Sequence, residues 1–149
     1  MVLIPGVNGD GTKLYALSMH KACVDNNYDL VIVNWRGMAG VPLKSAKTYN
    51  GFDTSHIEEA VDFIYNEYCL DEKGKQIKRI SAIGMSLGAG ILAIYQSKMG
   101  EQSKLDSSIG ICCAFDFKVA TSFIKTNFLR LYDMAVGKSF TEYAENYFL

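Results

Sequence analysis

Hydrophobic residues gather in four short runs, which alternate with segments of helical periodicity. The runs lie at residues 2–4, 30–33, 80–83 and 108–114, and each is nearly continuous and rich in β-branched or aliphatic residues. Continuous apolar runs of this length are typical of strands buried on both faces of a sheet. We therefore predict four strands, all of them buried.

The clearest helical segment follows the second run. Ile57, Val61 and Ile64 recur at helical spacing on one face, while acidic residues occupy the other faces. Ser55 and Glu58 have the spacing of a capping box, in which each side chain hydrogen-bonds the other residue's backbone N–H. The pattern predicts a helix that begins at about Ser55.

Two further helices complete the alternation. One is expected over residues 12–24 and another over 87–99, ending at Gly100. Alternating strands and helices with right-handed crossovers give a mostly parallel sheet with helices on both faces. The fold class is therefore α/β, with one core over residues 1–116 and an aromatic-rich helical segment over residues 117–149.

Composition limits the classes of function. The chain of 149 residues is 49% hydrophobic and 21% charged, with a net charge of −1, so it has no basic field for nucleic acid. Its apolar runs are shorter than the roughly 18 residues that span a bilayer, and it begins with no leader pattern, so the default expectation is a cytoplasmic location. The cysteines and histidines lack metal-ligand spacing, and no metal or cofactor is expected.

The stretch Gly84-Met85-Ser86-Leu87-Gly88 has the pattern GxSxG between a predicted strand and a predicted helix. In that context the turn holds a serine hydroxyl above the sheet, and Gly84 and Gly88 let the strand and helix close tightly around it. We predict that Ser86 is a nucleophile. The alternative is that Ser86 caps the helix and the two glycines serve packing alone.

A serine nucleophile needs N–H donors for the oxyanion that forms during attack. Leu87 offers one at the start of the helix, and Val7, in the glycine-rich loop after the first strand, is predicted to offer the second. The same loop has the glycine spacing of a phosphate-binding P-loop over residues 6–13. However, Thr12 and Lys13 stand in reversed order, which disfavours nucleotide binding.

The chain has two histidines, His20 and His56, and both precede Ser86. In this type of site the acid and the histidine follow the serine, so we expect both histidines to be surface or capping residues. Asp116, after the last strand, is expected to be a cap or loop anchor. The triad histidine and acid are thus assigned to no residue here. Because losing the histidine costs a factor of about 10⁶ in turnover, we expect this chain alone to be nearly inactive.

Several stretches, in order along the chain, resemble one known family. They are residues 3–9, 33–43, 49–54 and 82–92, with a looser match at 113–116. Together they resemble the α/β-hydrolase superfamily, in particular its branch of acylglycerol and phospholipid lipases and short-chain carboxylesterases. The resemblance covers almost the whole chain and is more specific than GxSxG alone.

The resemblance implies a partial α/β-hydrolase fold. The four strands correspond to the third through sixth of the family's sheet, and the helical segment resembles the start of its lid. Ser86 falls on the family's nucleophile, and Val7 and Leu87 fall on its oxyanion-hole positions. Trp35 stands where the family usually carries histidine. Several animal members have a membrane helix near the N-terminus, so membrane association is left open for a longer parent protein.

Two hypotheses remain. The first is a serine hydrolase that acts on a small-molecule ester with a lipid-like acyl group. The second is a non-catalytic, degenerate hydrolase fold that binds a ligand or partner. Apolar residues of the helical segment either line an acyl-chain pocket or form ordinary core or exposed surface; they are Phe123, Phe128, Leu131, Tyr132 and Ala135. Genomic sequence beyond the codon of Leu149 would separate the hypotheses. An encoded aspartate loop and histidine would support the hydrolase, and their absence would weigh against it.

Overall fold

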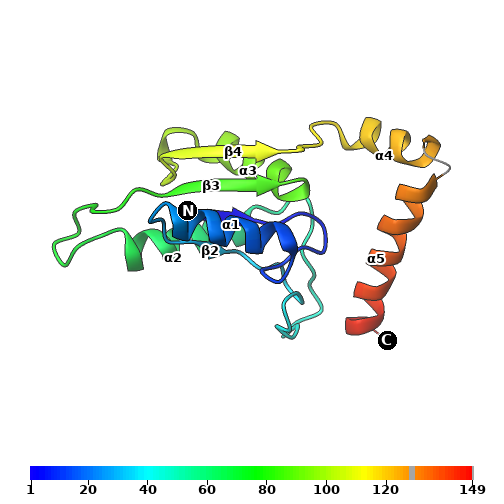
Figure 1. Ribbon diagram of the computed structural model, residues 1–149, viewed down its shortest axis with the longest axis horizontal. Helices are drawn as coiled ribbons and strands as arrows, with labels where there is room; N and C mark the ends of the chain where they lie inside the picture. The colour runs from blue at the N-terminus through cyan, green and yellow to red at the C-terminus, as the bar shows by residue number, and fades with distance from the viewer. Residues whose placement is uncertain (128–129, 149) are drawn as a thin grey trace.

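The sheet has four parallel strands, as predicted. The computed structural model describes residues 1–127 and 130–148, with side chains through residue 145. Its strands are β1 (Val2–Ile4), β2 (Val31–Ile32), β3 (Ser81–Met85) and β4 (Ser107–Ile111). They lie in the order β2-β1-β3-β4, and every pair is parallel. All carboxyl ends therefore point to one edge, where sites in such sheets form (Figure 1).

Helices cover both faces of the sheet, which confirms the α/β class. The helices are α1 (Leu14–Asp25), α2 (Ser55–Tyr68), α3 (Leu87–Met99), α4 (Phe117–Thr126) and α5 (Leu131–Phe148), with a short 3-10 turn at Gly100–Gln102. Val2 and Ile4 pack with α2 and α3 on one face, whereas Leu3 packs with α1 on the other. This split follows from the alternation of side chains along a strand.

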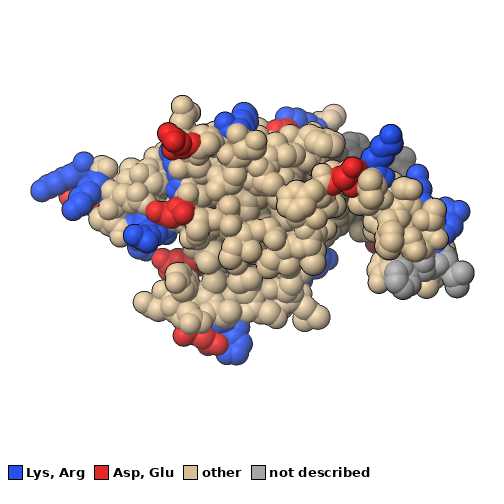
Figure 2. All heavy atoms as spheres, turned by 90° about the horizontal axis from the view of Figure 1, so that it is seen from above, with Lys and Arg blue, Asp and Glu red and all other residues tan. Residues whose placement is uncertain are grey.

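The prediction that all four strands are buried holds only in part for β2, whose two residues are half-buried, and is wrong for β4. All five of its residues are exposed, and Ile109 keeps 58% of its surface accessible. The physical reason is its place at the sheet edge, where β3 is its one paired neighbour and α1 packs over β1 and β3 instead. Figure 2, seen from the β4 side, shows a broad area with few charged side chains over this part of the molecule.

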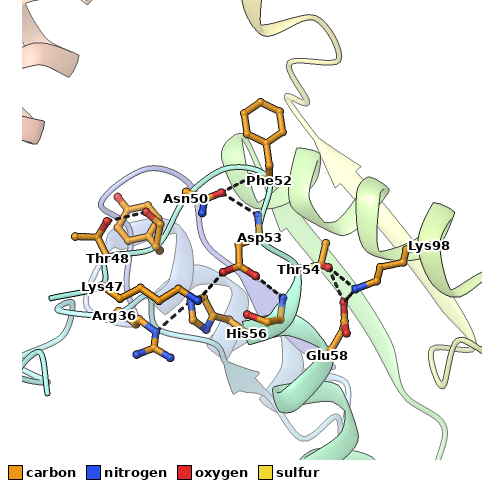
Figure 3. Close-up of polar contacts among 12 residues, drawn as sticks. Arg36, Lys47, Thr48, Asn50, Phe52, Asp53, Thr54, His56, Glu58 and Lys98 are labelled. Carbon is orange, nitrogen blue, oxygen red and sulfur yellow. Dashed lines mark hydrogen bonds and ion pairs between the residues drawn. The ribbon is translucent and has the colours of Figure 1, made fainter. Parts of the chain in front are cut away.

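Helix α2 begins where predicted, but the expected capping box does not form. Ser55 is the first helical residue, and the cap is Thr54, which makes no side-chain bond to the helix backbone. Instead, the Thr54 hydroxyl donates to Glu58 Oε1, and Lys98 pairs with the same carboxylate at 2.6 Å (Figure 3). Glu58 therefore links α2 to α3. Helix α3 spans the predicted residues and ends at Gly100, whose φ is +52°.

Helices α4 and α5 lie beyond the carboxyl ends of the strands (Figure 1). Most of their described aromatic and aliphatic residues are exposed, including Phe123 at 59%, Leu131 at 63% and Tyr132 at 59%, whereas Tyr143 packs against the core. Phe128 lies outside the described residues. Within the described ranges, no helix combines the length and apolar character needed to cross a membrane. The division into a core over 1–116 and a lid-like segment remains a prediction.

Candidate active site

Ser86 occupies a sharp turn between β3 and α3. Its backbone has φ 51° and ψ −113°, a conformation that side-chain-bearing residues seldom adopt. Its N–H donates to the Ile111 carbonyl at 2.8 Å, so the end of β4 holds the turn in place. The residue is exposed, and no hydrogen bond to its hydroxyl occurs among the described residues. Such strain is stored where surrounding structure enforces it, often at functional sites.

Gly84 and Gly88 leave no room for side chains. A Cβ on Gly84 would lie 2.6 Å from Ala89 Cα, and one on Gly88 would lie 2.8 Å from the Ile4 carbonyl carbon. Both neighbours are backbone atoms, which cannot move aside without shifting an element. The two glycines therefore let the first turn of α3 pack directly against β3 and the end of β1.

The loop after β1 approaches Ser86 closely. A Cβ on Gly6 would lie 3.2 Å from Ser86 Cβ and 3.8 Å from its hydroxyl oxygen. Val7 is the next residue along this loop, and Leu87 follows Ser86 directly. Neither the Val7 N–H nor the Leu87 N–H has a hydrogen-bond acceptor within residues 1–127 and 130–148. The structure thus places the peptide before Val7 beside Ser86, with Leu87 next to it at the start of α3.

Neither histidine contacts Ser86 through a hydrogen bond in the described part of the chain. His20 is exposed on α1. His56 lies in the first turn of α2, where its Nε2 accepts a hydrogen bond from Arg36 Nε at 3.2 Å (Figure 3). Burial lowers the pKa of His56 below its usual value, and the positive charge of Arg36 adds to this effect. The lowered pKa and the hydrogen bond accepted by Nε2 both favour the neutral form of His56.

Two aspartates near the rim serve loop structure. Asp116 caps α4, where its Oδ1 accepts from the Val119 N–H at 2.9 Å, which confirms the predicted capping role. Asp53 accepts from the Ser55 N–H at 3.0 Å and pairs with Lys47 at 3.2 Å (Figure 3). Hydrogen bonds from Ser55 and Lys47 hold the pKa of Asp53 well below its usual range.

Helix α5 contacts the loops that follow β1 and β2, and no pattern in the sequence predicts these contacts. Asn8 Nδ2 donates to the Ser139 carbonyl at 2.8 Å and to its hydroxyl at 2.6 Å. The Tyr143 hydroxyl donates to the Arg36 carbonyl at 2.8 Å. These partners are more than 100 residues apart in sequence, and no local pattern identifies such pairs. The tail thereby covers part of the rim beside the candidate nucleophile.

An apolar hollow of about 540 Å³ lies beside α3. Its lining includes Gly90, one turn beyond Ser86, together with three exposed or half-buried aromatic side chains, Phe52, Phe115 and Phe117. Phe52 and Phe117 meet edge to face, with ring centroids 5.8 Å apart. The hollow is therefore formed jointly by the loop before α2, residues 90–98 of α3, and the segment that joins β4 to α4.

Comparison with known proteins gives several relatives. The chain is 31% identical over 126 residues to Protein abhd-3.2 of Caenorhabditis elegans, covering 84% of this chain and 32% of that protein. It is 22% identical to a Saccharomyces cerevisiae monoacylglycerol lipase over 99% of this chain and 32% of the lipase. It is 28% identical to human Phospholipase ABHD3 over 70% of this chain and 24% of the relative.

The chain spans about a third of the length of the curated relatives it matches. No family model matches it, and no solved structure gives a significant match.

Proposed function

Since this chain belongs to the α/β-hydrolase superfamily, we propose that it is a serine hydrolase of the esterase or lipase type. Its substrate would be a carboxylic ester with a lipid-like acyl group. The observation that carries the proposal is the strained turn at Ser86, which packs closely against the loop after β1. A Cβ on Gly6 would lie 3.2 Å from Ser86 Cβ. A serine used only as a helix cap has no need of a positive φ, since cap residues ordinarily adopt extended backbone.

The proposed reaction runs through an acyl-enzyme. Ser86 Oγ attacks the ester carbonyl carbon while a base takes its proton, and the N–H groups of Val7 and Leu87 hold the oxyanion. Collapse of the tetrahedral intermediate expels the alcohol, which takes up the proton. Water then attacks the acyl carbon and releases the carboxylic acid, regenerating the serine. We assign the base and the acid to no residue of this chain, and therefore expect low activity from it alone.

The lipid-like substrate class is supported by two observations. Relatives are named as a monoacylglycerol lipase and as a phospholipase. In addition, the apolar hollow beside α3 is lined mainly by aromatic and aliphatic groups, which suit a hydrocarbon chain. For a longer parent protein, we propose action at a membrane surface, where such substrates reside.

The non-catalytic alternative is favoured by one observation. His56 is engaged by Arg36 and His20 is exposed on α1, so neither is arranged as a base for Ser86. A degenerate hydrolase fold that binds a lipid-like ligand would tolerate this arrangement.

Ester turnover distinguishes the two functions. Hydrolysis of p-nitrophenyl esters of increasing acyl length is measured with and without imidazole, which supplies a base from solution. Under the proposed function, and after subtraction of the hydrolysis that imidazole catalyses without protein, imidazole raises turnover, longer acyl chains are preferred, and Ser86→Ala abolishes the imidazole-dependent part. Equal turnover by wild type and Ser86→Ala under every condition would instead support the binding protein.

A further inference from the structure

A buried indole holds the loop that carries Val7. Trp35 is 1% exposed and lies just after β2, in a different loop from Val7. Its Nε1–H donates to the Pro5 carbonyl at 3.2 Å and to the Gly6 carbonyl at 3.0 Å. A buried N–H group with two acceptors is a strong constraint. If these hydrogen bonds were broken, the buried donor would keep its full desolvation penalty with nothing to compensate it.

These hydrogen bonds fix more than the carbonyl groups themselves. The Gly6 carbonyl also accepts from the Gly9 N–H at 3.0 Å, so two donors determine its direction. Because a peptide unit is planar and trans, the N–H of Val7 lies in the same plane and points opposite to the Gly6 carbonyl. Whatever orients the Gly6 carbonyl therefore also orients the Val7 N–H, which itself has no acceptor in the described structure.

We propose that Trp35 is a positioning residue for the oxyanion hole, acting through the plane of the Gly6–Val7 peptide. The inference rests on the proposed function, in which the Val7 N–H is a donor to the oxyanion. The indole does not touch the reacting atoms. It keeps one donor aimed in a fixed direction, so that little reorganisation is needed when negative charge develops.

A second aromatic residue supports the same loop. The Tyr49 ring stacks on Trp35, with centroids 5.3 Å apart and planes at 20°. The Tyr49 hydroxyl accepts from the Asn8 N–H at 3.1 Å and donates to the Asn8 side-chain oxygen. Asn8 has φ +49°, in the left-handed region that asparagine tolerates better than most residues. The loop is thus held on both sides of Val7, by Trp35 at Gly6 and by Tyr49 at Asn8.

The first test is the rate of covalent labelling of Ser86 by a fluorophosphonate, with imidazole present as the base. Trp35→Phe keeps an aromatic ring but lacks the donor, and Trp35→His keeps a ring N–H. Losing an oxyanion donor outright costs roughly 100-fold or more, so a misdirected donor should cost about tenfold in Trp35→Phe. Trp35→His should stay within about threefold of wild type. Val61→Ala, a buried change in α2, controls for lost stability.

The second test observes the peptide itself and needs no activity. Gly-Val occurs twice in the chain, at residues 6–7 and 40–41. Labelling glycine carbonyls with ¹³C and valine nitrogens with ¹⁵N therefore yields two signals in an HNCO spectrum, and Val41→Ile identifies the second by removing it. We expect Trp35→Phe to shift the Gly6 carbonyl and Val7 N–H signals strongly, and the Gly40–Val41 signals weakly. Trp35→His should leave the Val7 signal closer to its wild-type position.

The outcomes separate this inference from the proposed function. An unmoved Gly6–Val7 signal in folded Trp35→Phe would overturn the inference, as would equal labelling losses in Trp35→Phe and Trp35→His at matched stability. Unchanged labelling of Trp35→Phe, where wild type is labelled, would also overturn it. If no variant and not even wild type is labelled, the proposed function fails, and the HNCO comparison alone decides whether Trp35 orients the peptide.

Discussion

The hydroxyl of Tyr49 both accepts from the backbone N–H of Asn8 and donates to the side-chain oxygen of the same residue. Tyr49 is 8% exposed, and burial raises the pKa of its hydroxyl above the usual value, so the group keeps its proton through neutral pH. The two hydrogen bonds therefore hold Asn8, a residue with positive φ next to Val7, in a fixed conformation at neutral pH.

Removing this hydroxyl should destabilise the fold. Tyr49→Phe leaves the Asn8 N–H without a protein acceptor, and we expect the free energy of unfolding to fall by about 1–3 kcal/mol. Urea denaturation of wild type and variant measures the difference. Tyr68→Phe is the matched control, because Tyr68 is 56% exposed and its ring contact with Phe63 survives the change. If both variants lost the same free energy of unfolding, the hydrogen bonds between Tyr49 and Asn8 would contribute nothing to stability.

Two glycines of α3 should respond in opposite directions to the same substitution. Gly88→Ala would force a Cβ against the backbone of Ile4 and Pro5 and should cost about 3 kcal/mol or more. Gly90→Ala would place its Cβ at an ordinary contact distance, 3.6 Å from the Phe117 ring, and should stabilise the helix by up to about 1 kcal/mol. Thermal unfolding checks the pair, and a Gly88→Ala protein as stable as wild type would contradict the close packing of the turn.

Stability should fall as the solution is acidified through the range where histidine titrates. The pKa of His56 is lowered in the fold, so the unfolded chain binds a proton first as pH falls. The contribution of His56 to the free energy of unfolding is therefore fully present above about pH 6.5 and declines below it. Arg36 and Lys47 oppose protonation, whereas Asp53 and Glu59 favour it. His56→Gln should flatten the change in thermal midpoint between about pH 7.5 and about pH 5.5, and an unaltered slope would contradict this assignment.

Docking of α5 should depend on Tyr143. Its hydroxyl donates to the Arg36 carbonyl, and its ring meets Tyr49 edge to face at 5.6 Å. Tyr143→Ala removes both contacts, so we expect faster tryptic cleavage at Lys138, because proteolysis follows the population of locally opened states. Met134→Ala, on the same helix but 65% exposed, should leave the cleavage rate near that of wild type. If both variants were cleaved at the same rate, α5 would not be held by Tyr143.

Sequence patterns predicted the parallel sheet and the turn at Ser86, because both depend on local information. Apolar runs mark the strands, and the glycines at 84 and 88 mark a close approach of backbone. The same patterns failed for β4, since an apolar run specifies a strand but not whether another element covers it. The capping box expected between Ser55 and Glu58 is absent for a related reason. Glu58 instead pairs with Lys98 of α3, a helix that is far from Glu58 in sequence.

The supports of the candidate site were beyond local patterns. In the sequence, Trp35 stands out only as a departure from the family's usual residue, although its hydrogen bonds to Pro5 and Gly6 organise the loop. Asn8 and Ser139 are 131 residues apart, and although Asn8 lies in the glycine-rich loop, no pattern in the sequence links it to Ser139. Such pairs arise from how the chain folds in three dimensions, and single residues carry no sign of them.

The central claim is that Ser86 is built to act as a nucleophile, and covalent labelling tests it most directly. The folded chain is incubated with a fluorophosphonate, with and without imidazole, and the adduct is located by mass spectrometry. We predict slow modification at Ser86 that imidazole accelerates and that Ser86→Ala abolishes. A folded chain that gains no adduct at Ser86 even with imidazole, or the same adduct mass in Ser86→Ala, would contradict the claim.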